Sequence, residues 1–305
     1  MKASSYGAAA LPQPTSERIW CAYFACVLAV ALFAPGGGAD GHAPWLCAAV
    51  HAVVLAAVVA CGWLATRRSP AAARVPRAAL AIVGLPTVFT ALCWLLPAVH
   101  PEPYEWWFLA VDRALVGADP GAFVRCLPGW LVDAMQVSYG AFYGICAFSA
   151  IAAGLASGPA AFDRAVLLLV GGFLASYLGY LLVPTLGPNR VLAFDHDVLG
   201  VWIAAPLRAS IDAGEANPWD CFPSGHTMMT LTSLLILWRW NRRWLPWLLA
   251  PCLLLLVSTV LLRYHWLVDI AGGALLAWPV ARGCDKLADR DGWAPAPPLG
   301  GLSRS

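Results

Sequence analysis

Long apolar segments separated by short polar ones make up most of the sequence from residue 18 onward. Eight of these segments approach or exceed the roughly 20 residues that a helix needs to cross a membrane. They cover residues 18–35, 42–65, 77–97, 134–157, 162–184, 225–240, 244–262 and 265–282. The pattern predicts an all-α protein, a polytopic membrane helix bundle with about eight transmembrane helices. The sixth segment is short and polar at its start, so we expect it to be partly buried in protein.

Composition supports a membrane protein and excludes an ordinary soluble domain. Of the 305 residues, 60% are hydrophobic and 12% are charged, whereas soluble domains carry about 25% charged residues. No feature of the sequence indicates a nucleic-acid partner. Cys126 and Cys221 lie in polar loops on the same predicted side, which leaves a disulfide between them open. His51, flanked by Val50 and Ala52 in the second segment, is expected to be a helix-packing residue.

The basic residues indicate the orientation. With a cytoplasmic N-terminus, most of the 19 Lys and Arg residues fall on the cytoplasmic side, as the positive-inside rule requires. Those left outside are Arg113, Arg125, Arg190, Arg208 and Arg263. An even number of spans returns the C-terminus to the cytoplasm. Both polar motifs described below then open on the extracytoplasmic side.

The segments divide the chain into four expected parts. Residues 1–17 form a disordered N-terminus without the features of a secretory signal. Residues 18–76 form two additional transmembrane helices, residues 77–282 a six-helix core, and residues 283–305 a disordered cytoplasmic tail.

Two outer loops of the core are long. In residues 98–133, acids beside Trp106 and Trp107 predict an interfacial helix of the aromatic belt, with contact to a lipid headgroup as the alternative. A structureless loop as long as residues 185–224 is uncommon unless it is functional, so we expect this loop to cover or line a site.

The first polar motif runs from Cys221 to Thr227 at the start of the sixth segment. Ser224 is a favourable N-cap, and Gly225 allows a close backbone approach. The free N–H groups at a helix N-terminus suit an anionic phosphate oxygen. His226 would then lie where it can protonate a leaving oxygen. The alternative is an ordinary capped helix with a solvent-facing His.

The second motif runs from Arg263 to Asp269. His265 and Asp269 are four residues apart and therefore share one helix face. An Asp bonded to one ring nitrogen leaves the other nitrogen available as a nucleophile. Charged residues at membrane depth are costly and usually functional. A structural His paired with a helix-end Asp is the alternative.

Together and in this order, the motifs resemble those of the type-2 phosphatidic acid phosphatase superfamily. Their spacing is most similar to its inositolphosphoryltransferase-like branch, which includes inositol phosphorylceramide synthases. The resemblance covers about residues 77–282 and implies a phosphatase-like core. It implies that His265 is the nucleophile that forms a phosphohistidine, with Asp269 as its orienting partner. It also implies that His226 is the general acid and then base. Phosphate oxygens would be bound by Ser224 and Gly225.

The chain departs from the family pattern in two places. The superfamily's phosphatases carry an Arg six residues before the nucleophilic His, where this chain has Thr259. Arg263, one helical turn further on, is expected to replace it as a phosphate ligand, with an interface anchor as the alternative. The usual upstream Lys and Arg-Pro motif is also missing. Residues 187–190 resemble the Gly-Pro-Arg turn of the transferase-like branch, so Arg190 is expected to contact phosphate rather than only to pair with a nearby Asp.

We therefore expect an integral membrane lipid phosphatase or phosphotransferase that acts on a lipid phosphate ester at the outer face of the membrane. One alternative is a headgroup transferase that passes a phosphoinositol-type group to an inositol or lipid alcohol instead of water. A non-enzymatic transporter or scaffold is the second alternative. We expect no cofactor and no metal, because the outer loops show no His, Asp and Cys residues at ligand spacing, and Asp195-His196-Asp197 stands alone.

Overall fold

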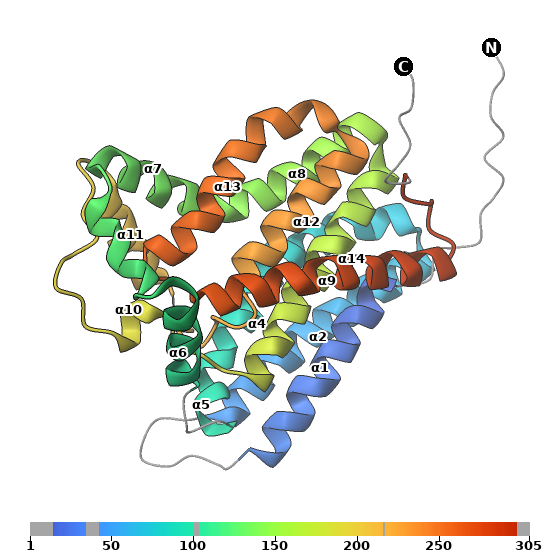
Figure 1. The fold of residues 1–305 in the computed structure, drawn as a ribbon. Coiled ribbons are helices and arrows are strands. Elements are labelled where there is room, and N and C mark those ends of the chain that lie inside the picture. Colours follow the sequence, from blue (N-terminus) through green and yellow to red (C-terminus); the bar gives the residue numbers. More distant parts are fainter. Residues whose placement is uncertain (1–14, 35–42, 100–103, 216, 298–305) are drawn as a thin grey trace.

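In the computed structural model the chain is a bundle of helices, and residues 15–34, 43–99, 104–215 and 217–297 are described. These residues contain no β-strand (Figure 1). Six helical segments are long and apolar enough to cross a membrane. They are α1 (Thr15–Phe33), α2 (Pro44–Arg67), Pro70–Trp94, α9 (Pro159–Leu182), Arg242–Leu261 with α13 (Leu245–Leu261), and α14 (Leu267–Arg290).

The other two predicted spans differ from simple crossing helices. Residues 134–157 fall on α7 (Gly129–Gly140) and α8 (Phe142–Ser157), which pass the same test only as a pair bent by 54°. Helix α12 (Gly225–Trp240) has 16 residues, too few for a full crossing. The described part of the chain thus has six spans, or seven with the bent pair, and the expected count of eight is not confirmed.

Helix α12 lies inside the bundle, as its short and polar sequence predicted. It packs against α8, α9, α13 and α14, and Met228, Met229 and Ile236 are completely buried. Because other helices surround it, α12 can carry hydroxyl and imidazole groups that would be costly against lipid.

The third span is irregular. Helices α3 (Arg74–Ala79) and α4 (Leu85–Ala91) are joined by a π-helical turn at Leu80–Gly84, with 3₁₀ turns at Pro70–Ala73 and Leu92–Trp94 on either side. Pro86 is the second residue after the π turn, and because proline has no backbone N–H it removes one donor from the hydrogen-bond ladder. The short α5 (Leu96–Val99) follows.

The two long loops at residues 98–133 and 185–224 both contain helices, so residues 185–224 are not wholly the structureless loop that their length suggested. They contain α6 (Glu105–Val116), the 3₁₀ segment Pro120–Cys126, α10 (Pro188–Val191) and α11 (Ala204–Gly214). Helices α6, α10 and α11 lie together at one end of the bundle, at the left of Figure 1. The predicted helix around Trp106 is present as α6, and Trp106 and Trp107 are exposed on it.

A buried carboxylate fixes the start of α11. Asp133 of α7 accepts hydrogen bonds from all four backbone N–H groups of residues 201–204, at 2.8–3.0 Å. A helix N-terminus leaves such donors without internal partners. One side chain therefore holds the second outer loop against α7.

The two leading helices are joined by the buried His51. Its Nδ1–H donates to the carbonyl of Cys47 at 2.8 Å, and its Nε2 accepts from the hydroxyl of Tyr23 at 3.0 Å. A carbonyl can only accept, which sets this tautomer. His51 therefore has the packing role expected of it.

The opposite end of the bundle is more ordered than the sequence indicated. Helix α1 begins at Thr15, inside the predicted disordered N-terminus, and α14 continues past residue 282 to Arg290. Thr15 and Arg18 both donate to Asp291, which joins the two ends. The predicted disorder is thus wrong where these segments are described; residues 1–14 and 298–305 lie outside the described residues.

Buried charges hold three helices together at this end. The carboxylate of Asp285 on α14 accepts from Arg164 of α9 at 3.0 Å and from Arg239 of α12 at 2.7 Å. Arg164 also pairs with Asp289 at 2.6 Å. All but Asp289 are buried. Burial makes the loss of one partner much more costly than the loss of a surface pair.

We expect Asp285→Ala to destabilise the protein by about 3–5 kcal/mol, because two buried guanidinium groups lose their shared carboxylate. Thermal unfolding of the detergent-purified protein measures this. Lys286→Ala, at the exposed neighbouring position, is the control and should stay within about 0.5 kcal/mol of the unaltered protein. Equal melting temperatures for the two variants would contradict a stabilising role for the cluster.

Candidate active site

The starts of α12 and α14 meet near the end of the bundle that carries α6, α10 and α11. The backbone N–H of Ser224 donates to the carbonyl of Asp269 at 3.0 Å. The approach depends on Gly273, where a Cβ would lie 2.5 Å from the carbonyl oxygen of Ser224. The two sequence motifs are therefore joined through their backbones.

The predicted N-cap is present. The side chain of Ser224 accepts from the N–H of Thr227 at 3.2 Å and from its hydroxyl at 3.1 Å. Gly225 begins the helix and faces α9, since a Cβ there would lie 2.7 Å from the hydroxyl of Tyr180. The N–H groups of Gly225 and His226 belong to the first turn, where the helix itself supplies no acceptors.

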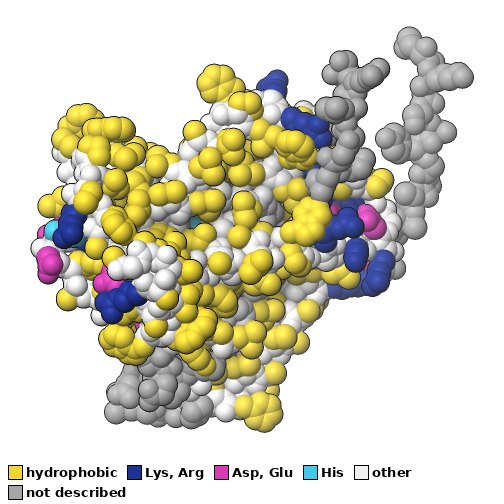
Figure 2. Space-filling model, viewed as in Figure 1, with side chains coloured by type: hydrophobic (Ala, Val, Ile, Leu, Met, Phe, Trp, Pro, Cys, Tyr) yellow, Lys and Arg dark blue, Asp and Glu magenta, His cyan; other side chains and the backbone are white. Residues whose placement is uncertain are grey.

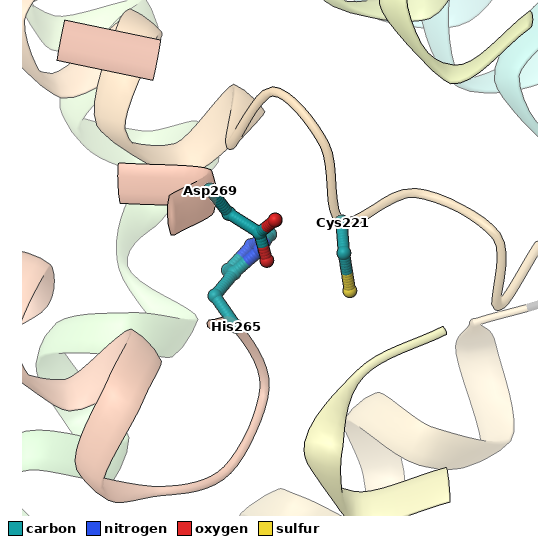
Figure 3. Close-up of side chains that lie close together, drawn as sticks. All are labelled: Cys221, His265 and Asp269. Carbon is teal, nitrogen blue, oxygen red and sulfur yellow. The ribbon is translucent and has the colours of Figure 1, made fainter. Parts of the chain in front are cut away.

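His226, His265 and Asp269 form one chain of contacts. Nδ1 of His226 lies 3.2 Å from Nε2 of His265, and Nδ1 of His265 lies 3.3 Å from Oδ2 of Asp269. A carboxylate only accepts, so Nδ1 of His265 carries the proton and Nε2 holds the lone pair. His265 and Asp269 are 3% and 0% exposed. Figure 3 shows their side chains in contact.

Aromatic rings hold both histidines in place. The ring of His226 lies between Tyr139, stacked at 4.5 Å, and Phe142, at 4.3 Å. Tyr139 also stacks at 4.0 Å on Tyr264, the residue before His265. Gln136 donates to the hydroxyl of Tyr264 at 3.0 Å. The bent pair α7 and α8 thus supplies a wall that positions the two motifs together.

A small polar pocket opens beside His265. Its lining includes Tyr139, Asn189, Arg190, Glu215, Asp220 and Cys221. The turn at residues 187–190 is held against the second motif by a hydrogen bond of 3.0 Å from the N–H of Asn189 to the carbonyl of Arg263. Arg190 is thereby brought into the same pocket as the candidate nucleophile.

The charge of Arg190 is partly compensated by an acid of the same loop. Its guanidinium lies 3.3 Å from Glu215, rather than pairing with Asp195 or Asp197. Burial raises the pKa of Glu215, while the hydrogen bond and charge of Arg190 lower it. Burial, and next the charge of Glu215, raise the pKa of Asp220 well above its usual range. A phosphate that enters the pocket therefore has to compete with Glu215 for the guanidinium of Arg190.

Arg263 does not lie where the helix-face argument placed it. Helix α13 ends at Leu261, and Arg263 has a left-handed backbone with φ 70°. Its guanidinium donates to the carbonyls of Gly121 and His196, at 3.1 and 2.9 Å, and contacts Nε2 of His196 at 2.8 Å. The residue ties the loops around Gly121 and His196 to the second motif. It is not among the residues that line the pocket, and its contact with phosphate stays a prediction.

Thr259 occupies the position that carries Arg in the superfamily's phosphatases, and its side chain does not line the pocket but bonds within its own helix. The side chain of Thr259 donates to the carbonyl of Leu256 at 2.7 Å, within its own helix. The carbonyl of Thr259 accepts from the N–H groups of Tyr264 and His265, at 2.9 and 2.8 Å. Thr259 therefore positions His265 through its backbone.

Sequence reasoning missed two acids of α6. Asp112 accepts from the N–H of Leu267 at 2.9 Å, at the start of α14, and Glu105 accepts from the N–H of Leu186 at 2.6 Å. Both acids are buried, and burial raises the pKa of Asp112 to about 6. They are seven residues apart, on one helix face, while the tryptophans occupy the other. That spacing was the available signal.

Cys126 and Cys221 do not form the disulfide that the sequence left open, since both thiols are free. Cys126 is exposed and Cys221 is buried. The sulfur of Cys221 instead lies with His265 and Asp269, all three ligand atoms within 4.8 Å of one another (Figure 3). A cluster of metal-binding side chains is thus present that residue spacing did not indicate.

With this geometry established, comparison with known proteins gives the family. A family model described as the PAP2 superfamily matches residues 106–282. The chain belongs to the PAP2 superfamily. The match begins in α6, ends in α14 and includes both motifs, the turn at residues 187–190 and the acid Asp112. No curated protein and no solved structure matched the chain. PAP2 membership and the apolar helices indicate a membrane protein of phosphatase type.

We expect Glu215→Gln to bind inorganic phosphate up to about fivefold more tightly, because partly exposed ion pairs contribute about 0.2–1 kcal/mol. Removing the acid frees Arg190 for the anion. Isothermal titration of the purified protein measures the affinity. Asp212→Asn removes a charge from the same loop without touching Arg190 and serves as control. Glu215→Gln is also made in a protein that already carries Arg190→Ala. If it raised the phosphate affinity there by the same factor, the ion pair would not be the cause.

Proposed function

We propose that this chain is an integral membrane enzyme that cleaves a lipid phosphate ester through a phosphohistidine on Nε2 of His265. The contact chain from Asp269 through His265 to His226 is the observation that carries the proposal. It provides a buried imidazole with a fixed tautomer, a lone pair directed at a second imidazole, and a pocket lined by the first of them, His265.

In the first step, the lone pair of His265 Nε2 attacks phosphorus, and the bond from phosphorus to the ester oxygen breaks. His226, whose protonated form is favoured by the negative charge of the bound phosphate, gives its proton to that oxygen. Asp269 stabilises the positive charge that develops on His265, through the hydrogen bond at Nδ1. The phosphoryl group has to replace the present contact between the two histidines, which is only 3.2 Å long.

Charge on the phosphate is met by Arg190 and by the start of α12. Arg190 lines the pocket with His265, and the first-turn N–H groups at Gly225 and His226 form an anion-binding helix end. Ser224 contributes by capping that helix. Neutralising the phosphoryl oxygens is the main requirement of phosphoryl transfer.

In the second step, an acceptor oxygen attacks phosphorus and the bond to His265 breaks, while His226 takes the acceptor's proton. Water as acceptor makes the chain a lipid phosphatase. An inositol or lipid alcohol makes it a headgroup transferase of the inositolphosphoryltransferase-like kind. Thr259, in place of the phosphatase Arg, and the turn at residues 187–190 favour this second candidate.

The distribution of charge supports an extracytoplasmic site. Lys and Arg side chains gather at the right of Figure 2, at the end of the bundle opposite the pocket, while apolar side chains cover the middle. Arg164, Arg239 and Arg290 belong to that basic end. Under the positive-inside rule it faces the cytoplasm. A transporter or scaffold gives no reason for the paired histidines.

We expect His265→Ala to abolish turnover, because the variant lacks the imidazole that is proposed to carry the phosphoryl group. Rapidly quenched wild-type protein should carry an acid-labile phosphoryl group, which mass spectrometry would locate on His265. Circular dichroism and melting temperature establish that the variant is folded. Wild-type turnover in a folded His265→Ala sample would end the nucleophile assignment.

The acceptor can be identified separately. Purified protein is incubated with a lipid phosphate, and separately with an inositol phospholipid and an alcohol acceptor such as ceramide. We expect free phosphate if water is the acceptor, and a new phospholipid if an alcohol is the acceptor. Each assay includes His226→Ala, which should lose both products because it lacks the acid and base.

A further inference from the structure

Three metal-binding donors of different chemistry converge beside the pocket. Cys221 comes from the loop before α12, His265 from the loop before α14, and Asp269 from the first turn of α14. Their ligand atoms all lie within 4.8 Å of one another, and all three residues are buried. Figure 3 shows the carboxylate of Asp269 on the side that faces Cys221.

Two of these donors have binding capacity that the fold leaves unused. Oδ1 of Asp269 has no hydrogen-bond partner although the residue is completely buried. The thiol of Cys221 donates one hydrogen bond, 3.4 Å to the carbonyl of Tyr264, and the lone pairs of its sulfur stay available. A buried polar atom without a partner is costly unless a ligand engages it.

The donor set suits a thiophilic divalent cation such as Zn²⁺. Thiolate, imidazole and carboxylate are its common protein ligands, at about 2.0–2.3 Å in a tetrahedron. Closing the three atoms onto one ion requires movements of about 1 Å or less at each. One thiolate and one carboxylate neutralise the dication, which suits a buried site. Cys221 and His265 both line the pocket, which provides an entry path and a fourth position.

Such an ion would change the protonation of the nucleophile. An ion shared with Asp269 takes Nδ1 of His265, the ring nitrogen 3.3 Å from that carboxylate. The proton of Nδ1 then moves to Nε2, which loses its lone pair for attack on phosphorus. The thiol proton of Cys221 goes to solvent, so one proton is released for each ion bound.

We propose that Cys221, His265 and Asp269 form an inhibitory site for a thiophilic divalent cation, which binds the nucleophile in its inactive tautomer. The inhibition rests on the function proposed above, whereas the binding does not. Nothing about residue spacing suggested the site, because Cys221 is far from the other two ligands in sequence.

Binding is tested with Co²⁺ added to metal-free, reduced, detergent-purified protein. We expect a thiolate-to-cobalt charge-transfer band in the wild type and in Cys126→Ser, which removes an exposed thiol. The band should be absent in Cys221→Ser. Its persistence there would overturn the proposal, as would its absence from the wild type.

Inhibition is tested with Zn²⁺ in the turnover assay, each variant against its own metal-free rate. The half-inhibiting concentration should rise at least about tenfold in Cys221→Ser and stay unchanged in Cys126→Ser. The half-inhibiting concentration of Zn²⁺ in the wild type should fall about tenfold for each unit by which the pH is raised, because binding releases one proton. If the wild type has no turnover but shows the cobalt band, the metal site holds and the proposed function fails.

A second variant covers the case in which Cys221→Ser does not fold. Asp269→Asn keeps the thiol and loses the anionic ligand. Co²⁺ should then bind at least about tenfold more weakly, while the charge-transfer band remains at saturation. Binding as tight as in the wild type would overturn the three-ligand site.

Discussion

The hydrogen bond from the Ser224 amide to the Asp269 carbonyl is the contact on which the site depends. It joins the starts of α12 and α14, and each start carries one of the two histidines or its partner. Because Gly273 has no side chain, the helices come close enough for this bond to form. The 3.2 Å contact between His226 and His265 follows from that junction.

Polar groups at this junction would be costly without a frame of protein around them. The outer helices supply it. Asp112 of α6 accepts a hydrogen bond from a backbone N–H at the start of α14, and Asp133 of α7 does the same at the start of α11. Tyr139 stacks on the rings of His226 and Tyr264. These contacts give a physical reason why the PAP2 match begins in α6 rather than at the first motif.

Helix α12 is held at both ends although it is too short to cross a membrane. Ser224 caps its start, and Arg239, near its end, pairs with Asp285 of α14. The same carboxylate binds Arg164 of α9. Helices α12 and α14 are thus aligned both at the pocket and at the basic end, so His226 on α12 keeps its distance from His265, which lies just before α14.

Much of this protein was determined by the sequence alone. A chain in lipid must satisfy its backbone hydrogen bonds within each helix and face the lipid with apolar side chains, so its spans appear as long apolar runs. The all-α bundle, the capped start at Ser224 and the pairing of His265 with Asp269 are local and were predicted. Long-range packing decided the rest. Helix α13 ends at Leu261, and the left-handed backbone at Arg263 directs its side chain to other loops rather than to the pocket lining. The buried acids Asp112 and Asp133 fix the loops that they bind. Only the fold brought Cys221 to His265 and Asp269, since contacts between distant segments have no signature in residue spacing.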